Sequence, residues 1–156
     1  MKRKKYLPYV VFILIALIVE GVSGIVTAKG MPAYQLLTKP ALTPPSIAFP
    51  IVWSILYVLM GIGAARVWTA NTGNHNGAIA VFAFQLALNF FWSVWFFGVQ
   101  KYLLAFVWLV ALIVSVAVML RVFYRIDRLA GLLQIPYLLW LFYAAYLNFA
   151  IWLLNR

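Results

Sequence analysis

The sequence predicts an all-α fold: an integral membrane bundle of five transmembrane helices. Of its 156 residues, 67% are hydrophobic and only 9% are charged, against roughly 25% charged residues in ordinary soluble domains. A soluble chain of this length could not bury so much apolar surface, because its surface-to-volume ratio is too high. The twelve lysines and arginines lie at the ends of apolar runs. This placement keeps charge out of lipid and argues against a nucleic-acid-binding surface.

Five apolar runs are long enough to cross a bilayer, which takes about 20 apolar residues. We expect helices at residues 6–27, 46–68, 77–97, 102–123 and 129–154, forming a single domain over residues 1–156. A polar loop at residues 71–77 separates the second helix from the third. Pro136 should kink the fifth helix, because proline removes a backbone hydrogen bond.

The first run has some features of a secretory signal peptide. A basic stretch at residues 2–5 precedes it, and it contains the small residues Gly21 and Gly24. However, the apolar run continues past these glycines to Thr27. We therefore expect an uncleaved first helix.

Basic residues in the predicted loops indicate how the bundle lies in the membrane. One side would hold Lys2, Arg3, Lys4, Lys5, Arg66, Arg121, Arg125 and Arg128, and the other Lys29, Lys39, Lys101 and Arg156. The richer side faces the cytoplasm in most membrane proteins. We expect a multi-pass protein of the cell membrane with its N-terminus in the cytoplasm and its C-terminus outside.

The one long connection, residues 28–45, joins the first two helices on the outer side. Pro40, Pro44 and Pro45 stiffen it, and the last two suit the start of a helix at Ser46. A rigid, partly apolar loop over a bundle is usually functional. We expect it to act as a lid.

Three predicted helix faces combine large aromatic residues with a polar or small residue. The faces are Trp53, Tyr57 and Gly61; Asn89, Trp92 and Phe96; and Tyr137, Trp140, Ala144 and Asn148. Such faces can line a mostly apolar ligand pocket, although a packed bundle core has the same spacing. Asn89 and Asn148 lie at membrane depth, where they either form interhelical hydrogen bonds or orient a ligand.

Glu20 is the one acidic residue within a predicted span. An intramembrane carboxylate is a candidate proton carrier or cation counter-ion. The alternative is a position near the outer end of the first helix, at the interface or paired with Lys29 or Lys39. We favour this alternative, so Glu20→Gln should leave ligand binding nearly unchanged.

Metal and cofactor sites are not expected. The chain has no cysteine, one histidine in the polar loop (His75) and two distant acids, which excludes the familiar metal-ligand sets. We expect Arg121, Arg125, Asp127 and Arg128 to form a cytoplasmic cluster of snorkelling side chains.

Five stretches in a fixed order carry a family resemblance across roughly residues 34–152. They are Lys39-Pro-Ala-Leu-Thr-Pro-Pro45, Val52-Trp-Ser-Ile-Leu-Tyr-Val-Leu-Met-Gly61, Leu86-Ala-Leu-Asn-Phe-Phe-Trp92 with Phe96-Phe-Gly98, Asp127-Arg-Leu-Ala130, and the segment from Pro136 to Trp152. Together they resemble the translocator protein / tryptophan-rich sensory protein (TspO/MBR) family, once called peripheral benzodiazepine receptors.

The resemblance implies a five-helix bundle, usually dimeric, that binds tetrapyrroles such as protoporphyrin IX and synthetic isoquinoline carboxamide or benzodiazepine drugs. The family pocket lies under the first loop. Carried over to this sequence, its lining would be Tyr34, Trp53, Tyr57, Asn89, Trp92, Trp140, Ala144 and Asn148. Some bacterial members are similar to slow, light-dependent porphyrin-degrading catalysts, which would give Trp53 and Trp140 a photochemical role.

The sequence departs from the family pattern in the lid. Ala33-Tyr34 stands where the family usually has Trp-Tyr, and Ala41-Leu42 stands where it has Ser-Trp. Two lid aromatic residues are therefore missing, which bears on porphyrin affinity more than on fold.

The favoured function is a membrane tetrapyrrole-binding sensor or scavenger with, at most, slow photo-oxidative porphyrin degradation. One alternative is a proton-coupled small-molecule exporter that uses Glu20, although small multidrug exporters have four helices and no lid loop. The other is a regulatory membrane partner without a ligand. The expected partners are a porphyrin or other flat aromatic ligand, membrane lipids and a second copy of the chain.

We expect the two copies to meet through the third helix. Ala80, Ala83 and Ala87 give that helix a small-residue face that allows close backbone approach. Gly61 and Ala65 on the second helix form a competing face.

Overall fold

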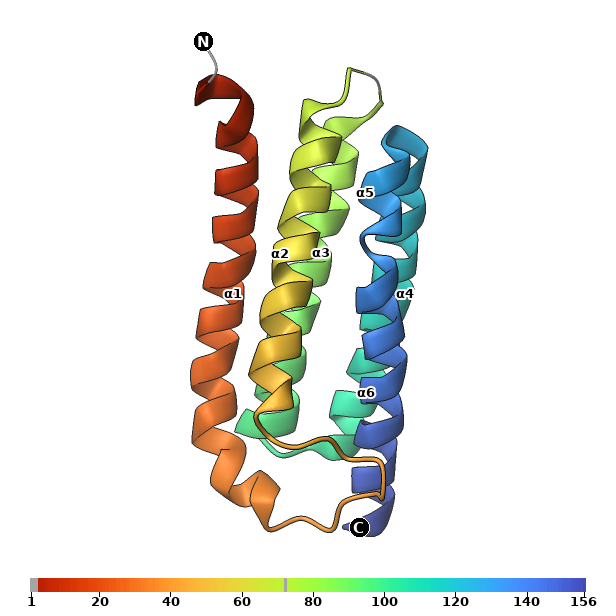
Figure 1. Cartoon of the computed structure of the whole chain (residues 1–156). Helices are drawn as coiled ribbons and strands as arrows, with labels where there is room; N and C mark the ends of the chain where they lie inside the picture. Colours follow the sequence, from red (N-terminus) through yellow and green to blue (C-terminus); the bar gives the residue numbers. More distant parts are fainter. Residues whose placement is uncertain (1–2, 72) are drawn as a thin grey trace.

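The computed structural model describes residues 3–71 and 73–156 as a bundle of helices (Figure 1). Its elements are α1 (Arg3–Gln35), α2 (Ala48–Thr69), α3 (His75–Ser93), the π-helix η1 (Val94–Gly98), α4 (Tyr102–Ile126), α5 (Arg128–Leu132) and α6 (Ile135–Leu154). Lys2 of the basic stretch and Thr72 of the polar loop lie outside the described residues. In the described part of the chain, five helical segments are long and apolar enough to cross a membrane. The prediction of a five-helix membrane bundle is confirmed.

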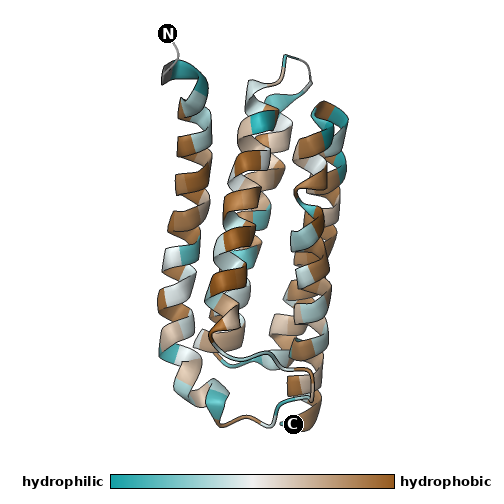
Figure 2. Ribbon diagram, in the orientation of Figure 1, coloured by the Kyte–Doolittle hydropathy of each residue, from teal (hydrophilic) through white to brown (hydrophobic). Residues whose placement is uncertain are grey.

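The outer surface of the bundle is apolar along most of its length. On α4, for example, the valines at positions 107, 110, 114 and 118 are all exposed. Figure 2 shows hydrophobic residues along the middle of the helices and hydrophilic ones gathered near the N-terminus and along the first loop. An exposed apolar surface of this extent suits contact with lipid rather than water.

The first helix is longer than predicted. α1 continues beyond Thr27 to Gln35, and it bends toward the loop in its last turns, where Pro32 lies inside the helix (Figure 1). The non-helical connection therefore covers residues 36–47 instead of the predicted 28–45. Gly30 allows this extension to pack, because a Cβ there would lie 2.3 Å from the Phe97 carbonyl oxygen of η1.

Two other helices are interrupted. The third span ends in the π-helix η1, which the sequence did not predict. The fifth span breaks between Leu132 and Ile135, and Pro136 lies in the first turn of α6. Proline is well tolerated there, because its missing N–H would have no partner within the helix. Instead of the predicted kink at Pro136, the fifth span has a break that ends just before this proline.

α1 and α2 approach each other most closely at Gly61. A Cβ on this glycine would lie 2.6 Å from the Ile13 Cα atom, so only glycine permits the contact. Gly61 and Ala65 are both buried within the chain. The idea that they form a competing dimer face is therefore wrong, because neither residue is available on the surface of the chain.

An ion pair ties α2 to the start of α5. The Arg66 guanidinium donates to both carboxylate oxygens of Asp127, at 2.9 and 2.8 Å. The same carboxylate accepts the Ala130 backbone N–H at 2.7 Å and so caps α5. The hydrogen bonds from Arg66 lower the pKa of the Asp127 carboxyl below its ordinary value. Asp127 is thus a link between helices, not only a member of the predicted snorkelling cluster.

Candidate functional site

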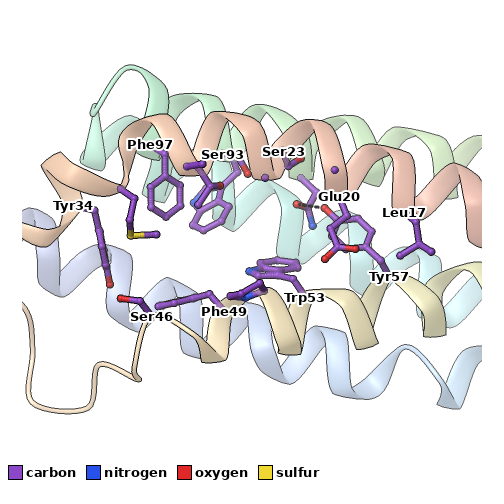
Figure 3. A pocket seen from close by; sticks show the side chains of 18 residues that line it. Leu17, Glu20, Ser23, Tyr34, Ser46, Phe49, Trp53, Tyr57, Ser93 and Phe97 are labelled. Carbon is purple, nitrogen blue, oxygen red and sulfur yellow. Dashed lines mark hydrogen bonds between the residues drawn. The ribbon is translucent and has the colours of Figure 1, made fainter.

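A cavity of about 600 Å³ lies between α1, α2 and the last part of the third span. Figure 3 shows its long shape, with Tyr34 and Ser46 at the end next to the loop and Leu17, Glu20 and Tyr57 at the other end. We call these the lid end and the deep end. The volume falls within the usual range for small-molecule sites.

Five of the eight predicted lining residues border this cavity. They are Tyr34, Trp53, Tyr57, Asn89 and Trp92. The ring of Trp53 packs against those of Tyr57 and Trp92, with centroids 5.8 and 6.2 Å apart. The cavity therefore has a continuous aromatic wall that runs from α2 to α3.

The other three predicted residues lie elsewhere. Trp140 borders a separate groove of about 440 Å³ beside α2 and α6. Its ring meets that of Trp53 edge-on, at 6.3 Å, so Trp53 stands between Trp140 and the cavity. Ala144 is buried. Asn148 accepts the indole N–H of Trp92 at 3.1 Å and donates to the Tyr102 carbonyl, so it positions Trp92 from behind.

A buried chain of hydrogen bonds fixes the polar groups at the deep end. The Tyr57 hydroxyl donates to Asn89 Oδ1 at 2.9 Å, and Asn89 Nδ2 donates to the Tyr137 hydroxyl at 2.6 Å. The Tyr137 hydroxyl in turn donates to Gln85 Oε1 at 2.9 Å. Both proposed roles of Asn89 are therefore compatible, since it joins helices and borders the cavity. Gln85 was missed, although it precedes Asn89 by one helical turn.

Tyr34 closes the lid end. It is 4% exposed, and its ring packs against Phe97 at 5.7 Å and Phe49 at 6.3 Å. The Lys39 ammonium lies 4.9 Å from the centre of the Tyr34 ring and donates to the Gln35 carbonyl oxygen at 3.0 Å. A positive charge therefore lies close to this end of the cavity.

The loop over residues 36–47 is fastened to the last helix. The Thr38 backbone N–H donates to Asn155 Oδ1, and Asn155 Nδ2 donates to the Thr38 carbonyl, both at 2.9 Å. The Tyr143 hydroxyl donates to the Leu42 carbonyl. The loop is thus held across the lid end at two points, Thr38 and Leu42.

Glu20 occupies a different place from the one expected. It lies in the middle of α1 and borders the cavity. Ser54 Oγ donates to its Oε1 at 2.5 Å, and the one ion pair among the described residues is that of Arg66 with Asp127. A position near the outer end of the first helix, and a pair with Lys29 or Lys39, are therefore wrong. The unpredicted extension of α1 moves the end of the helix away from Glu20.

α1 contributes much of the wall, of which only Tyr34 was predicted, because the predicted lining came from the first loop and the other helices. Ser23, Thr27 and Met31 all border the cavity. The available signal was the spacing of Gly21 and Gly24, whose missing side chains leave room beside Glu20. In the described part of the chain, no three His, Cys, Asp or Glu side chains come together as metal ligands.

Comparison with known proteins places this geometry in context. Residues 10–153 match the TspO/MBR family. The chain is 41% identical to the tryptophan-rich protein TspO of Chlorobaculum tepidum over 126 residues, 78% of each chain. It is 38% identical to the TspO protein of Archaeoglobus fulgidus over 144 residues, 91% of this chain and 94% of that protein. It is 34% identical to the human translocator protein over 133 residues, 83% of this chain and 79% of that protein.

Proposed function

This chain belongs to the TspO/MBR family, and from that premise we propose that it is a membrane sensor or scavenger that binds a flat tetrapyrrole under its first loop. Protoporphyrin IX is the ligand we choose for testing. The lining residues in this proposal are the predicted set, with Trp140, Ala144 and Asn148 acting from behind the wall. In the bilayer, the N-terminus faces the cytoplasm and the lid end faces outward.

The aromatic wall of the cavity is the observation that carries this proposal. Trp53, Tyr57 and Trp92 present large ring surfaces to one elongated space. A flat macrocycle gains both apolar burial and ring stacking against such a surface. The Lys39 ammonium at the lid end suits the acidic groups of a porphyrin.

Slow light-driven porphyrin degradation is the finer part of the proposal. The indole of Trp53 gives one electron to the photo-excited porphyrin, and the reduced porphyrin passes that electron to oxygen. The electron vacancy is shared with Trp140, in edge contact with Trp53, and is filled when the ground-state porphyrin gives up one electron. The porphyrin radical cation then combines with the superoxide formed from oxygen, so that both oxygen atoms are added to the macrocycle and both indoles are restored. Trp53 and Trp140 would be the catalytic residues in this sense, and the protein needs no bound cofactor for it.

Fluorescence titration tests both parts. Purified protein in lipid nanodiscs is titrated with protoporphyrin IX in the dark, and we expect saturable quenching of tryptophan emission. Quenching that rises linearly, as simple partition into lipid gives, would contradict binding and favour the ligand-free partner. Under illumination, porphyrin absorbance should decay faster than in empty nanodiscs. Equal decay rates would remove the photochemical part and leave binding intact.

A second candidate function, proton-coupled export of aromatic cations, is favoured by the position of Glu20 in the cavity wall. Its test is proton flux in proteoliposomes driven by a gradient of such a cation. Flux in the native protein that disappears in Glu20→Gln would establish the exporter in place of the sensor. An absence of flux in both proteins would eliminate it.

A further inference from the structure

We infer that Glu20 makes the deep end of the cavity selective for flat aromatic ligands that carry a positively charged nitrogen. This rests on the proposed function of the cavity as a site for aromatic ligands, but not on the ligand being a porphyrin. The inference goes beyond that function in two ways: it names a residue that determines ligand specificity, and it gives the orientation in which the ligand enters.

The first observation is the position of the carboxyl group. Glu20 borders the cavity at the end that is farther from the loop, with Leu17 and Tyr57 as neighbours (Figure 3). Tyr34 lies fourteen positions after Glu20 on the same helix, which corresponds to roughly 20 Å along α1. A carboxyl group at this depth faces the ligand space rather than bulk water.

The second observation is that few hydrogen-bond donors surround the Glu20 carboxyl group. Glu20 forms no ion pair with any described residue. Its hydrogen-bond partner is Ser54, whose Oγ lies 2.5 Å from Glu20 Oε1 and 2.7 Å from the Pro50 carbonyl oxygen. The hydroxyl has one hydrogen, so it can donate to only one of these two oxygens at a time. The carboxylate therefore retains acceptor capacity that this chain does not fill.

The third observation is an unpartnered hydroxyl beside it. Ser23, three residues further along α1, also borders the cavity and is 7% exposed. Its Oγ lies near the Tyr57 hydroxyl but has no partner of acceptable hydrogen-bond geometry. Residues three apart share a helix face. A ligand ammonium with several N–H groups can donate to both Glu20 and Ser23.

Groups of opposite charge lie near the two ends of the cavity. The Lys39 ammonium lies over the Tyr34 ring at the lid end, whereas the Glu20 carboxyl borders the deep end. In a site with little water, a charge-assisted hydrogen bond is stronger than at an exposed surface. An unpaired carboxylate at membrane depth is costly, so a ligand cation that pairs with it recovers much of that cost. The ligand should therefore enter with its cationic end first and leave any acidic group near Lys39.

The test uses two probes of the same shape and different charge. 9-Aminoacridine and acridine are both flat, three-ringed and fluorescent, but only the first is a cation at mildly alkaline pH. Nanodiscs of zwitterionic lipid prevent the membrane surface from concentrating the cation. We expect native protein to prefer 9-aminoacridine over acridine. In Glu20→Gln, 9-aminoacridine binding should weaken by about tenfold to a hundredfold, the loss typical of one charge-assisted hydrogen bond, while acridine binding should change little.

Two further variants serve as controls. Glu20→Asp keeps the charge on a shorter arm and should restore part of the preference. Thr27→Val removes a different hydroxyl from the cavity wall without changing charge, and should affect both probes equally. Circular dichroism and size-exclusion chromatography check that each variant is folded before its affinities are compared.

The outcomes separate this inference from the proposed function. Equal binding of the two probes by native protein, or an unchanged preference in Glu20→Gln, would overturn the inference even if protoporphyrin IX binds normally. Protoporphyrin IX itself carries acidic side groups, so its affinity should change little in Glu20→Gln. A cation preference that depends on Glu20, together with no binding of protoporphyrin IX, would uphold the inference and defeat the porphyrin proposal.

Discussion

The same two helices, α1 and α2, are sealed together in one half of the bundle and separated by a cavity in the other. In the sealed half, Ala16, Met60 and Ala64 are fully buried, and Gly61 brings the α1 backbone close to α2. In the open half, a Cβ on Gly21 or Gly24 would meet nothing within 4 Å. Glycine therefore has opposite effects at these positions: Gly61 admits a neighbouring helix, whereas Gly21 and Gly24 leave open space at the cavity wall.

This contrast places the packed contacts and the proposed ligand site in different lengths of one helix pair. Phe12 packs on Trp68 and Phe82 in the sealed half, with ring centroids 6.1 and 6.0 Å apart. Such a packed region can hold the bundle together while the open half keeps its hollow. Substitutions in the two halves should thus have separable effects on unfolding and on ligand affinity.

The largest effect is expected at Gly61. In Gly61→Leu, the new side chain must displace Ile13 and separate α1 from α2, at a cost of about 1–3 kcal/mol or more in the free energy of unfolding. Denaturation in mixed micelles, followed by circular dichroism, measures this change. A variant as stable as the native protein would contradict the close contact between α1 and α2 at Gly61.

Gly24→Leu is the matched change in the open half. The leucine fills space at the cavity wall, so affinity for protoporphyrin IX should fall by about tenfold, which corresponds to about 1.4 kcal/mol. The free energy of unfolding should stay the same or rise slightly, because glycine is a poor helix former. Dark fluorescence titration and the same denaturation assay measure the two quantities. Loss of stability without loss of affinity would contradict the assignment of the two halves.

Trp53→Phe and Trp140→Phe should separate binding from photochemistry. Each replacement keeps an aromatic ring but removes the more easily oxidised indole, so dark affinity should fall by only roughly 0.5–1.5 kcal/mol. Light-driven loss of porphyrin absorbance should fall much further. Trp68→Phe, in the sealed half, is the control and should change neither property. Equal losses of affinity and decay rate would reduce Trp53 and Trp140 to binding residues.

A smaller effect is expected from the ion pair in the sealed half. Asp127→Asn keeps an oxygen for the Ala130 N–H but removes the charge that pairs with Arg66, at a cost of about 0.5–1 kcal/mol. The pKa of Asp127 is lowered in the folded protein. Its stabilising contribution is therefore complete above the ordinary carboxyl pKa and is lost as the pH falls through the lowered value. Denaturation measured at neutral and acidic pH should show this dependence in the native protein but not in Asp127→Asn.

The smallest effect on both halves is expected from the outer face of α3. Ala80, Ala83 and Ala87 are exposed, and we propose that they form the contact between two copies of the chain. Leucines at positions 83 and 87 should convert dimers to monomers in cross-linking of native membranes, with little change in ligand affinity. Dimers that persist would contradict the α3 interface, and native membranes that yield only monomers would contradict dimerisation itself.

The parts that the sequence predicted are those set by local pattern. Apolar run length identifies the spans, and Pro136 marks the break in the fifth one, because proline restricts its own backbone wherever it occurs. The aromatic spacing of Trp53 and Tyr57 correctly grouped two side chains that border the cavity.

The parts that it did not predict depend on contacts between helices. The turns of α1 after Thr27 contain a glycine, and this glycine proves to be the point where η1 packs. No local pattern places Glu20 opposite Ser54, thirty-four residues away. Asp127 looked like one more residue in a charged cluster until the fold brought Arg66 to it. Trp140 shares a helix face with Ala144, but the intervening ring of Trp53 separates it from the cavity.

The paired hydrogen bonds of Thr38 with Asn155 join positions 117 residues apart and so close most of the chain into a noncovalent ring. Asn155, directly after α6, therefore acts as a latch. The loop can lift at Thr38 only after these two hydrogen bonds break. If the loop moves when a ligand enters, the C-terminal end of α6 should shift with it. In the proposed orientation this end lies on the outer surface. In the proposed function, the loop that covers the ligand and the C-terminal end of the chain therefore lie side by side, so that one end of the bundle carries both.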